Sequence, residues 1–312
     1  MRPLVSVIVP FYNVSRYFDR SARSILGQTW PETEFIFVED GSPDDCAVQL
    51  EALLDGPFRD RKERVTLLRS ENRGVTAART AGLACAKGDY ILCADADDWM
   101  EPDMIERLVG TALETGSDFV YCDYYKEYAG RTRIGHEAEY DRITQLLTDL
   151  IRGRRFHGIL WNKLIRRELF FEHTPCQPVA NLREDLILVY QMVFHARKRY
   201  HLPVPLYHYR KDNGASILHQ DKRVQTRLCA VNQLHLYDFY RDMEQPNPVS
   251  VICDTFLLQT LWYVYKTSSW DLFDQYPCLK DDAKQLHLCK GAMYHIGRYF
   301  HIRNALRKRG IA

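Results

Sequence analysis

Apolar and polar positions alternate in two distinct ways over the first 115 residues. Short runs in which nearly every residue is apolar are separated by longer stretches in which apolar residues recur every three or four positions. The short runs are typical of strands buried on both faces, and the longer stretches are typical of helices that cover them. The expected strands are 5–9, 35–38, 65–68 and 90–93, and the expected helices are 17–26, 47–54, 75–86 and 104–115. This order predicts an α/β fold with a doubly wound, mostly parallel sheet flanked by helices.

The second half of the chain has a less regular pattern. Residues 119–121 predict another strand, 126–141 a hairpin or excursion, and 142–151 a helix. Apolar residues at helical spacing follow Glu184 and Asp185, which places this acidic pair at a helix N-terminus. Only helical spacing occurs from residue 222 onward, with prolines at 246, 248 and 277. We therefore predict one domain over 1–220 and a helical C-terminal region over 221–312.

Polar side chains gather where three of the expected strands end, at 10–13, 39–42 and 95–98. Because the carboxyl ends of parallel strands meet at one edge of a sheet, these segments are expected to lie together. Asp95, Asp97 and Asp98 place three carboxylates within four residues, and these repel one another unless water or a cation neutralises them. Oxygen donors favour Mg²⁺ or Mn²⁺, so the segment is a candidate metal site; alternatively, it is a solvated loop end or helix cap.

Composition narrows the classes of protein without selecting one. The net charge of +1 over 312 residues gives no global field that favours nucleic acid, so we expect no nucleic-acid partner. Nine cysteines without any Cys-x-x-Cys spacing argue against a disulfide framework or a zinc ribbon and fit the cytoplasm. The apolar run at 4–9 is too short for a membrane span. No Gly-x-Gly-x-x-Gly and no phosphate loop occurs after the first expected strand, which argues against Rossmann oxidoreductases and P-loop enzymes.

The ordered motifs of the chain resemble those of the family 2 glycosyltransferases with the GT-A fold. The resemblance covers roughly residues 4–217 and extends through these strings: Val7-Ile8-Val9-Pro10-Phe11-Tyr12-Asn13, Val38-Glu39-Asp40-Gly41-Ser42, Asn72-Arg73-Gly74, Asp95-Ala96-Asp97-Asp98, Trp161-Asn162-Lys163-Leu164 and Glu184-Asp185. Glu39 stands where many members carry aspartate. Arg79 matches the motif arginine of the family, and Thr80 stands where asparagine commonly follows it. The Gln-x-x-Arg-Trp string of the processive members is absent, so a non-processive enzyme of the surface-glycan type is expected.

The resemblance implies an inverting transfer of a hexose or N-acetylhexosamine from a nucleotide diphosphate sugar, with UDP as the expected nucleotide, to a hydroxyl. The implied acceptor is a glycan or a lipid-linked glycan in surface polysaccharide synthesis. The nucleotide-binding half would span about 1–125 and the acceptor-binding half about 126–220. Asp185 would be the general base, and Asp97 with Asp95 would hold Mn²⁺ or Mg²⁺. Further residues would bind the nucleotide sugar, namely Pro10, Tyr12, Asp40, Arg79, Asp95 and Ala96, or line the sugar pocket, namely Trp161, Glu184 and Asp98.

Each implied role has a plainer alternative. Asp185 could cap a helix, Asp40 could belong to an ordinary turn, and Arg79 could pair with a surface acid. Tyr12 and Trp161 could pack in the core. The whole protein could be a catalytically degenerate nucleotide-sugar-binding protein, or a hydrolase that uses a carboxylate pair without metal. The histidines at 157, 208 and 219 are not assigned as metal ligands, because none has ligand spacing.

The C-terminal segment 290–312 carries six Lys or Arg residues and no acid, with apolar residues at helical spacing. This predicts a basic amphipathic helix, which could contact the inner face of a membrane peripherally or pack on its own domain. Aromatic residues at 256–265 predict a helical core or a homodimer contact.

Overall fold

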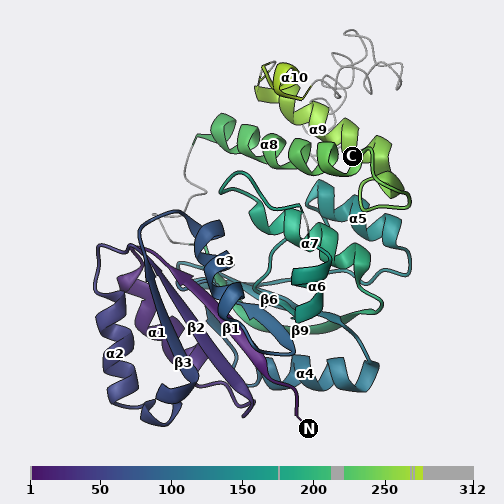
Figure 1. The fold of residues 1–312 in the computed structure, drawn as a ribbon. Helices are drawn as coiled ribbons and strands as arrows, with labels where there is room; N and C mark the ends of the chain where they lie inside the picture. The colour runs from purple at the N-terminus through teal and green to yellow at the C-terminus, as the bar shows by residue number, and fades with distance from the viewer. Residues whose placement is uncertain (1, 175, 212–220, 268, 270, 277–312) are drawn as a thin grey trace.

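The computed structural model of the chain describes residues 2–174, 176–211, 221–267, 269 and 271–276. Helices lie on both sides of a central sheet, and further helices stack at one end (Figure 1). The elements in chain order are β1 (Val5–Phe11), α1 (Ser15–Leu26), β2 (Thr33–Asp40), α2 (Cys46–Asp55), η1 (Arg59–Arg64), β3 (Val65–Ser70), α3 (Val75–Cys85), β4 (Tyr90–Cys93), β5 (Trp99–Met100), α4 (Met104–Thr115), β6 (Phe119–Tyr128), β7 (Arg131–Gly135), α5 (Ile143–Arg152), β8 (Lys163–Arg166), α6 (Arg167–Glu172), α7 (Glu184–His195), β9 (Arg199–Arg210), α8 (Lys222–Tyr240), η3 (Ser250–Ile252), α9 (Cys253–Thr267) and α10 (Leu272–Gln275).

The strands form one sheet in the order β3-β2-β1-β4-β8-β6-β9-β5, with β7 paired to β6. The first four strands are parallel, as predicted, and Val7 of β1 lies opposite Phe35 of β2 and Leu92 of β4. The insertion of β8 between β4 and β6, antiparallel to both, was not predicted. The later strand β9 runs parallel to β6 and pairs antiparallel with β5. The parallel half therefore presents the carboxyl ends of β1, β2 and β4 at one edge, as expected.

Successive residues of the central strands pack against opposite faces of the sheet, because side chains alternate along a strand. On β1, the side chains of Val7 and Val9 lie on the face covered by α1, α2 and α4, whereas that of Ile8 lies on the face covered by α3, α5 and α7. Both faces are buried, which explains why these strands are continuous apolar runs and do not alternate with polar residues. The glycines that follow α4 and α5, Gly116 and Gly153, adopt the left-handed conformation and end these helices.

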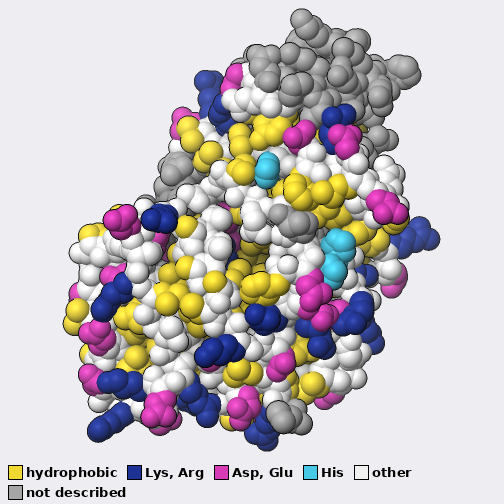
Figure 2. Space-filling model, in the orientation of Figure 1, with side chains coloured by type: hydrophobic (Ala, Val, Ile, Leu, Met, Phe, Trp, Pro, Cys, Tyr) yellow, Lys and Arg dark blue, Asp and Glu magenta, His cyan; other side chains and the backbone are white. Residues whose placement is uncertain are grey.

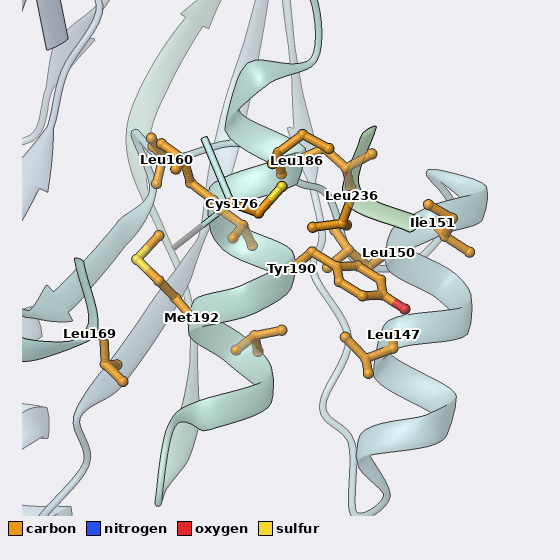
Figure 3. Packing of buried hydrophobic residues seen from close by; sticks show 14 of the residues in the cluster. Leu147, Leu150, Ile151, Leu160, Leu169, Cys176, Leu186, Tyr190, Met192 and Leu236 are labelled. Atoms are coloured by element: carbon orange, nitrogen blue, oxygen red, sulfur yellow. The ribbon is translucent and has the colours of Figure 1, made fainter. Parts of the chain in front are cut away.

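The C-terminal helices share a core with the sheet domain. Leu150 of α5, Tyr190 of α7 and Leu236 of α8 belong to one buried cluster, shown in Figure 3. Phe256 and Leu261 of α9 extend this cluster, so these aromatic and aliphatic positions are core residues of the described helices. The predicted basic helix at 290–312 lies outside the described residues, and the boundary proposed at residue 220 stays a prediction.

The surface has no dominant charge on the face drawn in Figure 2. Lys and Arg side chains are interspersed with Asp and Glu side chains over that face. Such mixing agrees with the near-zero net charge of the chain. In the part of the chain that the structure describes, no helix has the length and apolar character needed to cross a membrane.

Candidate active site

The turn after β4 that carries Asp95, Asp97 and Asp98, called the acidic turn below, is held from two directions by hydrogen bonds to its backbone. The N–H of Ala94 donates to the Ile8 carbonyl of β1 at 2.9 Å, and the N–H of Asp98 donates to the Asp95 carbonyl at 3.2 Å. From β9, the Tyr207 hydroxyl accepts the Asp95 N–H at 3.0 Å. This turn is therefore fixed to both the parallel half of the sheet and the later strand β9.

Arg210 at the end of β9 fixes the second half of the same turn. Its N–H donates to Asp98 Oδ1 at 2.7 Å, and its Nε donates to the Asp97 carbonyl at 3.1 Å. Neither Tyr207 nor Arg210 received a role from the sequence. Their function depends on the pairing of β9 with the sheet, which local sequence does not reveal.

Arg79 connects the acidic turn with the predicted general base. This residue of α3 is only 3% exposed, and its Nη1 donates to Asp185 Oδ1 at 2.6 Å. The same nitrogen lies 3.4 Å from Glu184 Oε1, and Nη2 lies 3.9 Å from Asp95 Oδ1. Arg79 thus pairs with acids of the site and not with a distant surface acid. Residues that are more than a hundred positions apart in the sequence form one charged cluster here.

Asp185 lies in the first turn of α7, where a helix N-terminus favours a carboxylate. Its Oδ2 accepts the N–H of Leu160 at 3.3 Å, in addition to the bond from Arg79 to Oδ1. Arg183, the residue at the N-cap position before α7, makes no side-chain cap bond. Asp185 is therefore held by Arg79 and a loop amide and does not cap its own helix from the N-cap position.

The electrostatics of the cluster follow from burial and from repulsion among the acids. Burial, opposed by Arg79 and reinforced by Asp185 and Asp97, raises the pKa of Asp95 to about 7. Burial and Asp185 likewise raise the pKa of Glu184, and burial with Asp97 and Asp95 raises the pKa of Asp98 well above its usual range. Burial disfavours the charge of Arg79, yet Asp185 and its acidic neighbours raise the pKa of this guanidinium. The acidic turn is thus short of positive charge, while Arg79 is permanently charged.

Asp98 shows that shortage most clearly, because its Oδ2 is buried without a close hydrogen-bond partner among the described residues, and the Tyr207 hydroxyl and the Arg210 N–H only partly offset the rise in its pKa. We expect Asp98→Asn to stabilise the protein without added metal by roughly 1 kcal/mol at pH 7.5, because it removes a charge that burial and the neighbouring acids disfavour. Oδ1 would still accept the Arg210 N–H, and the amide would remove the buried charge. A raised pKa in the folded state means that stability falls as pH rises above about 4, so the difference should shrink at pH 5. Urea unfolding of the parent and the variant at both pH values measures this difference in stability.

Asp123 provides the matched control, since it is equally buried but its two oxygens accept bonds from His201, His136 and the Glu137 N–H. Burial opposes its charge, yet these bonds lower the pKa of Asp123. Asp123→Asn should therefore destabilise the protein at pH 7.5. A loss of stability in Asp98→Asn as large as that in Asp123→Asn would contradict the inference that the buried charge of Asp98 destabilises the fold.

The predicted nucleotide-binding residues lie at the ends of β1 and β2. The Asn13 N–H donates to Ser42 Oγ at 2.7 Å, which joins the two polar segments as predicted. Tyr12 is 46% exposed, so it is not a core residue, whereas the neighbouring Phe11 is buried. Pro10 lies within β1 opposite Val38, and its backbone is part of the sheet edge.

Asp40 is buried and already has partners from the chain. Its two oxygens accept the N–H groups of Arg73 and Gly74, each at 2.8 Å. Gly41, which follows it, has φ of +63°, and a Cβ there would lie 2.6 Å from the Asn72 nitrogen. Asp40 and Gly41 therefore fix the loop before α3, and a contact of Asp40 with a base stays a prediction.

The other predicted pocket residues are packed. Trp161 is buried and stacks on Tyr207 with 4.4 Å between ring centroids, and its edge meets Tyr124 at 4.9 Å. Ala96 is buried within the acidic turn. Trp161 thus supports Tyr207, which in turn bonds to the turn at Asp95. The exposed fraction of a ring cannot be read from sequence, which is why packing and pocket lining remained alternatives.

The two described candidate histidines have partners other than a metal. His208 has its two ring nitrogens 2.7 Å from Glu127 Oε1 and 2.8 Å from Glu101 Oε1, and His157 Nδ1 lies 3.2 Å from Glu137 Oε1. His219 lies outside the described residues. Over the described ranges, no three His, Cys, Asp or Glu side chains form a metal-binding group. Asp95 and Asp97 alone supply carboxylate oxygens of the kind that Mg²⁺ prefers, and an ion held by these two residues would complete its shell with phosphate and water.

Comparison with solved structures identifies the class of fold. The structure of S. aureus TarS in complex with UDP-GlcNAc matches 90% of this chain and 92% of that chain, with a TM-score of 0.58 and 18% identity. The mannosyltransferase PcManGT from Pyrobaculum calidifontis, in complex with GDP-Man and Mn²⁺, matches 98% of this chain and 87% of its own, with a TM-score of 0.57 and 17% identity. The chain therefore has an α/β fold similar to that of the GT-A glycosyltransferases.

Sequence comparison identifies the family. The family described as Glycosyl transferase family 2 matches residues 6–173, which is more than half of the chain. EpsH of Bacillus subtilis, named as a glycosyltransferase, is 32% identical over 218 residues, 67% of this chain and 61% of EpsH. The chain thus spans less than two thirds of that relative. It belongs to glycosyltransferase family 2.

Proposed function

We propose that the protein is an inverting, non-processive glycosyltransferase that acts in the cytoplasm. It moves a hexose or N-acetylhexosamine from a UDP-sugar to a hydroxyl of a glycan or lipid-linked acceptor in surface polysaccharide synthesis. The observation that carries the proposal is the buried guanidinium of Arg79, which holds Asp185 beside Asp95 of the acidic turn. Family membership supports sugar transfer, and the UDP-GlcNAc bound by TarS supports a nucleotide-sugar donor.

Asp185 is the proposed general base. The acceptor oxygen bonds to the anomeric carbon while the bond from that carbon to the diphosphate oxygen breaks, and the nucleoside diphosphate leaves with the electron pair. The acceptor proton passes to Asp185 Oδ2, because Oδ1 is bonded to Arg79 at 2.6 Å and Oδ2 accepts one long bond from Leu160. Attack from the side opposite the leaving group inverts the anomeric centre. A positioned base of this kind typically contributes about 10²- to 10⁴-fold in rate.

Asp97, together with Asp95, would hold Mn²⁺ or Mg²⁺, and Mn²⁺ is present in the PcManGT complex. Such an ion, when bound, neutralises the charge that develops on a leaving diphosphate. The bond from Arg210 Nε to the Asp97 carbonyl fixes the turn that carries this carboxylate. The exposed ring of Tyr12 would stack on the base, beside Pro10 and Asp40. Ala96 would help to bind the nucleotide sugar, and Asp98, Trp161 and Glu184 would shape the sugar pocket from buried or largely buried positions.

A thermal-stability panel tests the proposal. The parent protein is melted with UDP-, GDP-, CDP- and dTDP-sugars, with and without Mn²⁺, next to Asp97→Ala. At a hundredfold excess over the dissociation constant, a ligand stabilises the folded state by about 2.7 kcal/mol, which corresponds to a rise of several degrees in Tm. We expect this rise for UDP-sugars with Mn²⁺ and its loss in Asp97→Ala.

Asp103→Ala is the matched control, because Asp103 is an exposed acid before α4 that pairs weakly with Arg107. It should respond to nucleotide and Mn²⁺ as the parent does. An equal response from Asp97→Ala would exclude Asp97 as a metal ligand. Nucleotide binding without any donor hydrolysis or transfer would favour the degenerate binding protein, and no response to any nucleotide would overturn the transferase itself.

A further inference from the structure

We propose that Asn232 of α8 and Arg183, which donates to Tyr263 of α9, are positioning residues for sugar transfer. They connect the C-terminal helices to the segment 179–183, which leads directly into Glu184 and Asp185. The inference rests on the proposed role of Asp185 as general base. It gives the helices after residue 221 a part in catalysis that the sequence did not indicate.

Asn232 uses its whole hydrogen-bonding capacity on this segment. Its Oδ1 accepts the N–H groups of Val179 at 2.9 Å and Ala180 at 3.0 Å. Its Nδ2 donates to the carbonyls of Ala180 and Leu182, both at 2.9 Å. A side-chain amide has two acceptor sites and two donor hydrogens, so all four are in use. The residue is 1% exposed, and asparagine is not a favoured residue inside a helix, so its contribution lies in these bonds.

Arg183 fixes the backbone conformation immediately before α7, whose first turn carries Asp185. Its φ of +56° places it in the left-handed region, which costs a residue with a Cβ about 1–2 kcal/mol. Such a conformation persists only where the surroundings enforce it. Arg183 Nη1 donates to the Tyr263 hydroxyl of α9 at 2.8 Å, and its carbonyl accepts the Leu186 N–H at 3.1 Å, which starts α7. The direction in which α7 leaves the loop, and therefore the place of Asp185, is tied to α9.

The opposite side of the segment lies against the start of α3. A Cβ at Gly74 would lie 2.4 Å from Asn181 Nδ2, so Gly74 permits a close approach between the two segments. Gly74 also donates its N–H to Asp40, and α3 carries Arg79 on the next turn. The segment is thus held between α8 and the helix that supplies the guanidinium to Asp185. A shift of the segment would change the geometry of the Arg79–Asp185 pair.

The test compares Asn232→Ala and Tyr263→Phe with Thr260→Val. Thr260 is also buried, and its hydroxyl bonds to Gln233 of α8 and Phe256 of α9, so the control perturbs the contact between these helices without touching 179–183. Turnover, the KM for the UDP-sugar, and Mn²⁺-dependent UDP affinity are measured well below each Tm. We expect kcat to fall roughly 10- to 100-fold in Asn232→Ala, because a misplacement of about 1 Å has effects of this size.

Donor KM and UDP affinity should stay within about twofold of the parent values, since donor binding does not require the base. Tyr263→Phe, which removes one hydroxyl, should lower kcat in the same direction and remains informative if Asn232→Ala does not fold. Thr260→Val should keep the parent kcat. A parent-like kcat in both Tyr263→Phe and Asn232→Ala would overturn the positioning role. An equal loss of kcat in Thr260→Val would do the same. If Asp185→Asn has lost its activity, either result leaves the proposed function itself standing. A parent without donor turnover would overturn the proposed function, and the positioning role with it.

Discussion

Asp185→Asn is expected to lower kcat for sugar transfer by about 10³-fold, within the range that a general base contributes. The asparagine keeps an oxygen that can accept the 2.6 Å bond from Arg79, so the site should remain assembled. What is lost is the ability to take the acceptor proton. Initial rates of transfer or donor hydrolysis measure the effect, and calorimetry should show UDP affinity with Mn²⁺ close to that of the parent.

Glu184→Gln distinguishes the role of Asp185 as the proposed base from that of its neighbour Glu184. Glu184 lies 3.4 Å from the same Arg79 nitrogen and precedes Asp185 on the same helical turn. Its replacement should cost no more than about tenfold, because it alters the field around the base without removing the proton acceptor. A larger loss in Glu184→Gln than in Asp185→Asn would exchange the two roles. Full activity of Asp185→Asn would refute the assignment of the base.

Arg79→Met is expected to reduce the free energy of unfolding by about 3 kcal/mol, the lower end for breaking a buried ion pair. The guanidinium is buried beside Asp185, Glu184 and Asp95, and its removal leaves these acids to repel one another. The lower end applies because the Asp95 side chain is 36% exposed and keeps some hydration. Urea unfolding measures the change.

The pH dependence of that loss has a defined sign. Arg79 opposes the rise in the pKa of Asp95, which is already raised to about 7, so its removal raises that pKa further. An acid with a raised pKa holds more protons in the folded than in the unfolded state, so stability declines as pH rises from about 4 towards that pKa. The loss in Arg79→Met should therefore be larger at pH 8 than at pH 6. Arg107→Met, at an exposed ion pair with 3.8 Å separation, should change stability by no more than about 0.5 kcal/mol at either pH. Equal effects of the two substitutions would show that the charge cluster does not stabilise the fold.

The elements that the sequence predicted well are those specified by local periodicity. The helix expected at 104–115 is α4 (Met104–Thr115), and the apolar run at 90–93 is β4 (Tyr90–Cys93). The helix is recognised by apolar residues at every third or fourth position and the strand by an unbroken apolar run, and neither pattern needs a distant partner to be recognised. The strand β8 was missed because its four residues have no periodicity of their own, and it is a strand only through its antiparallel partners β4 and β6.

The sequence by itself determined the parallel half of the sheet and the family of the protein, and it determined that acids follow β4 and open α7. These are properties of local pattern and of motifs in fixed order. Only the tertiary structure decided that Arg79 joins Asp185 to Asp95, that Arg210 holds the acidic turn, and that Asn232 holds the segment before Asp185. Each of these contacts spans between 16 and 113 positions and depends on burial and charge compensation in space, which local sequence patterns do not reveal.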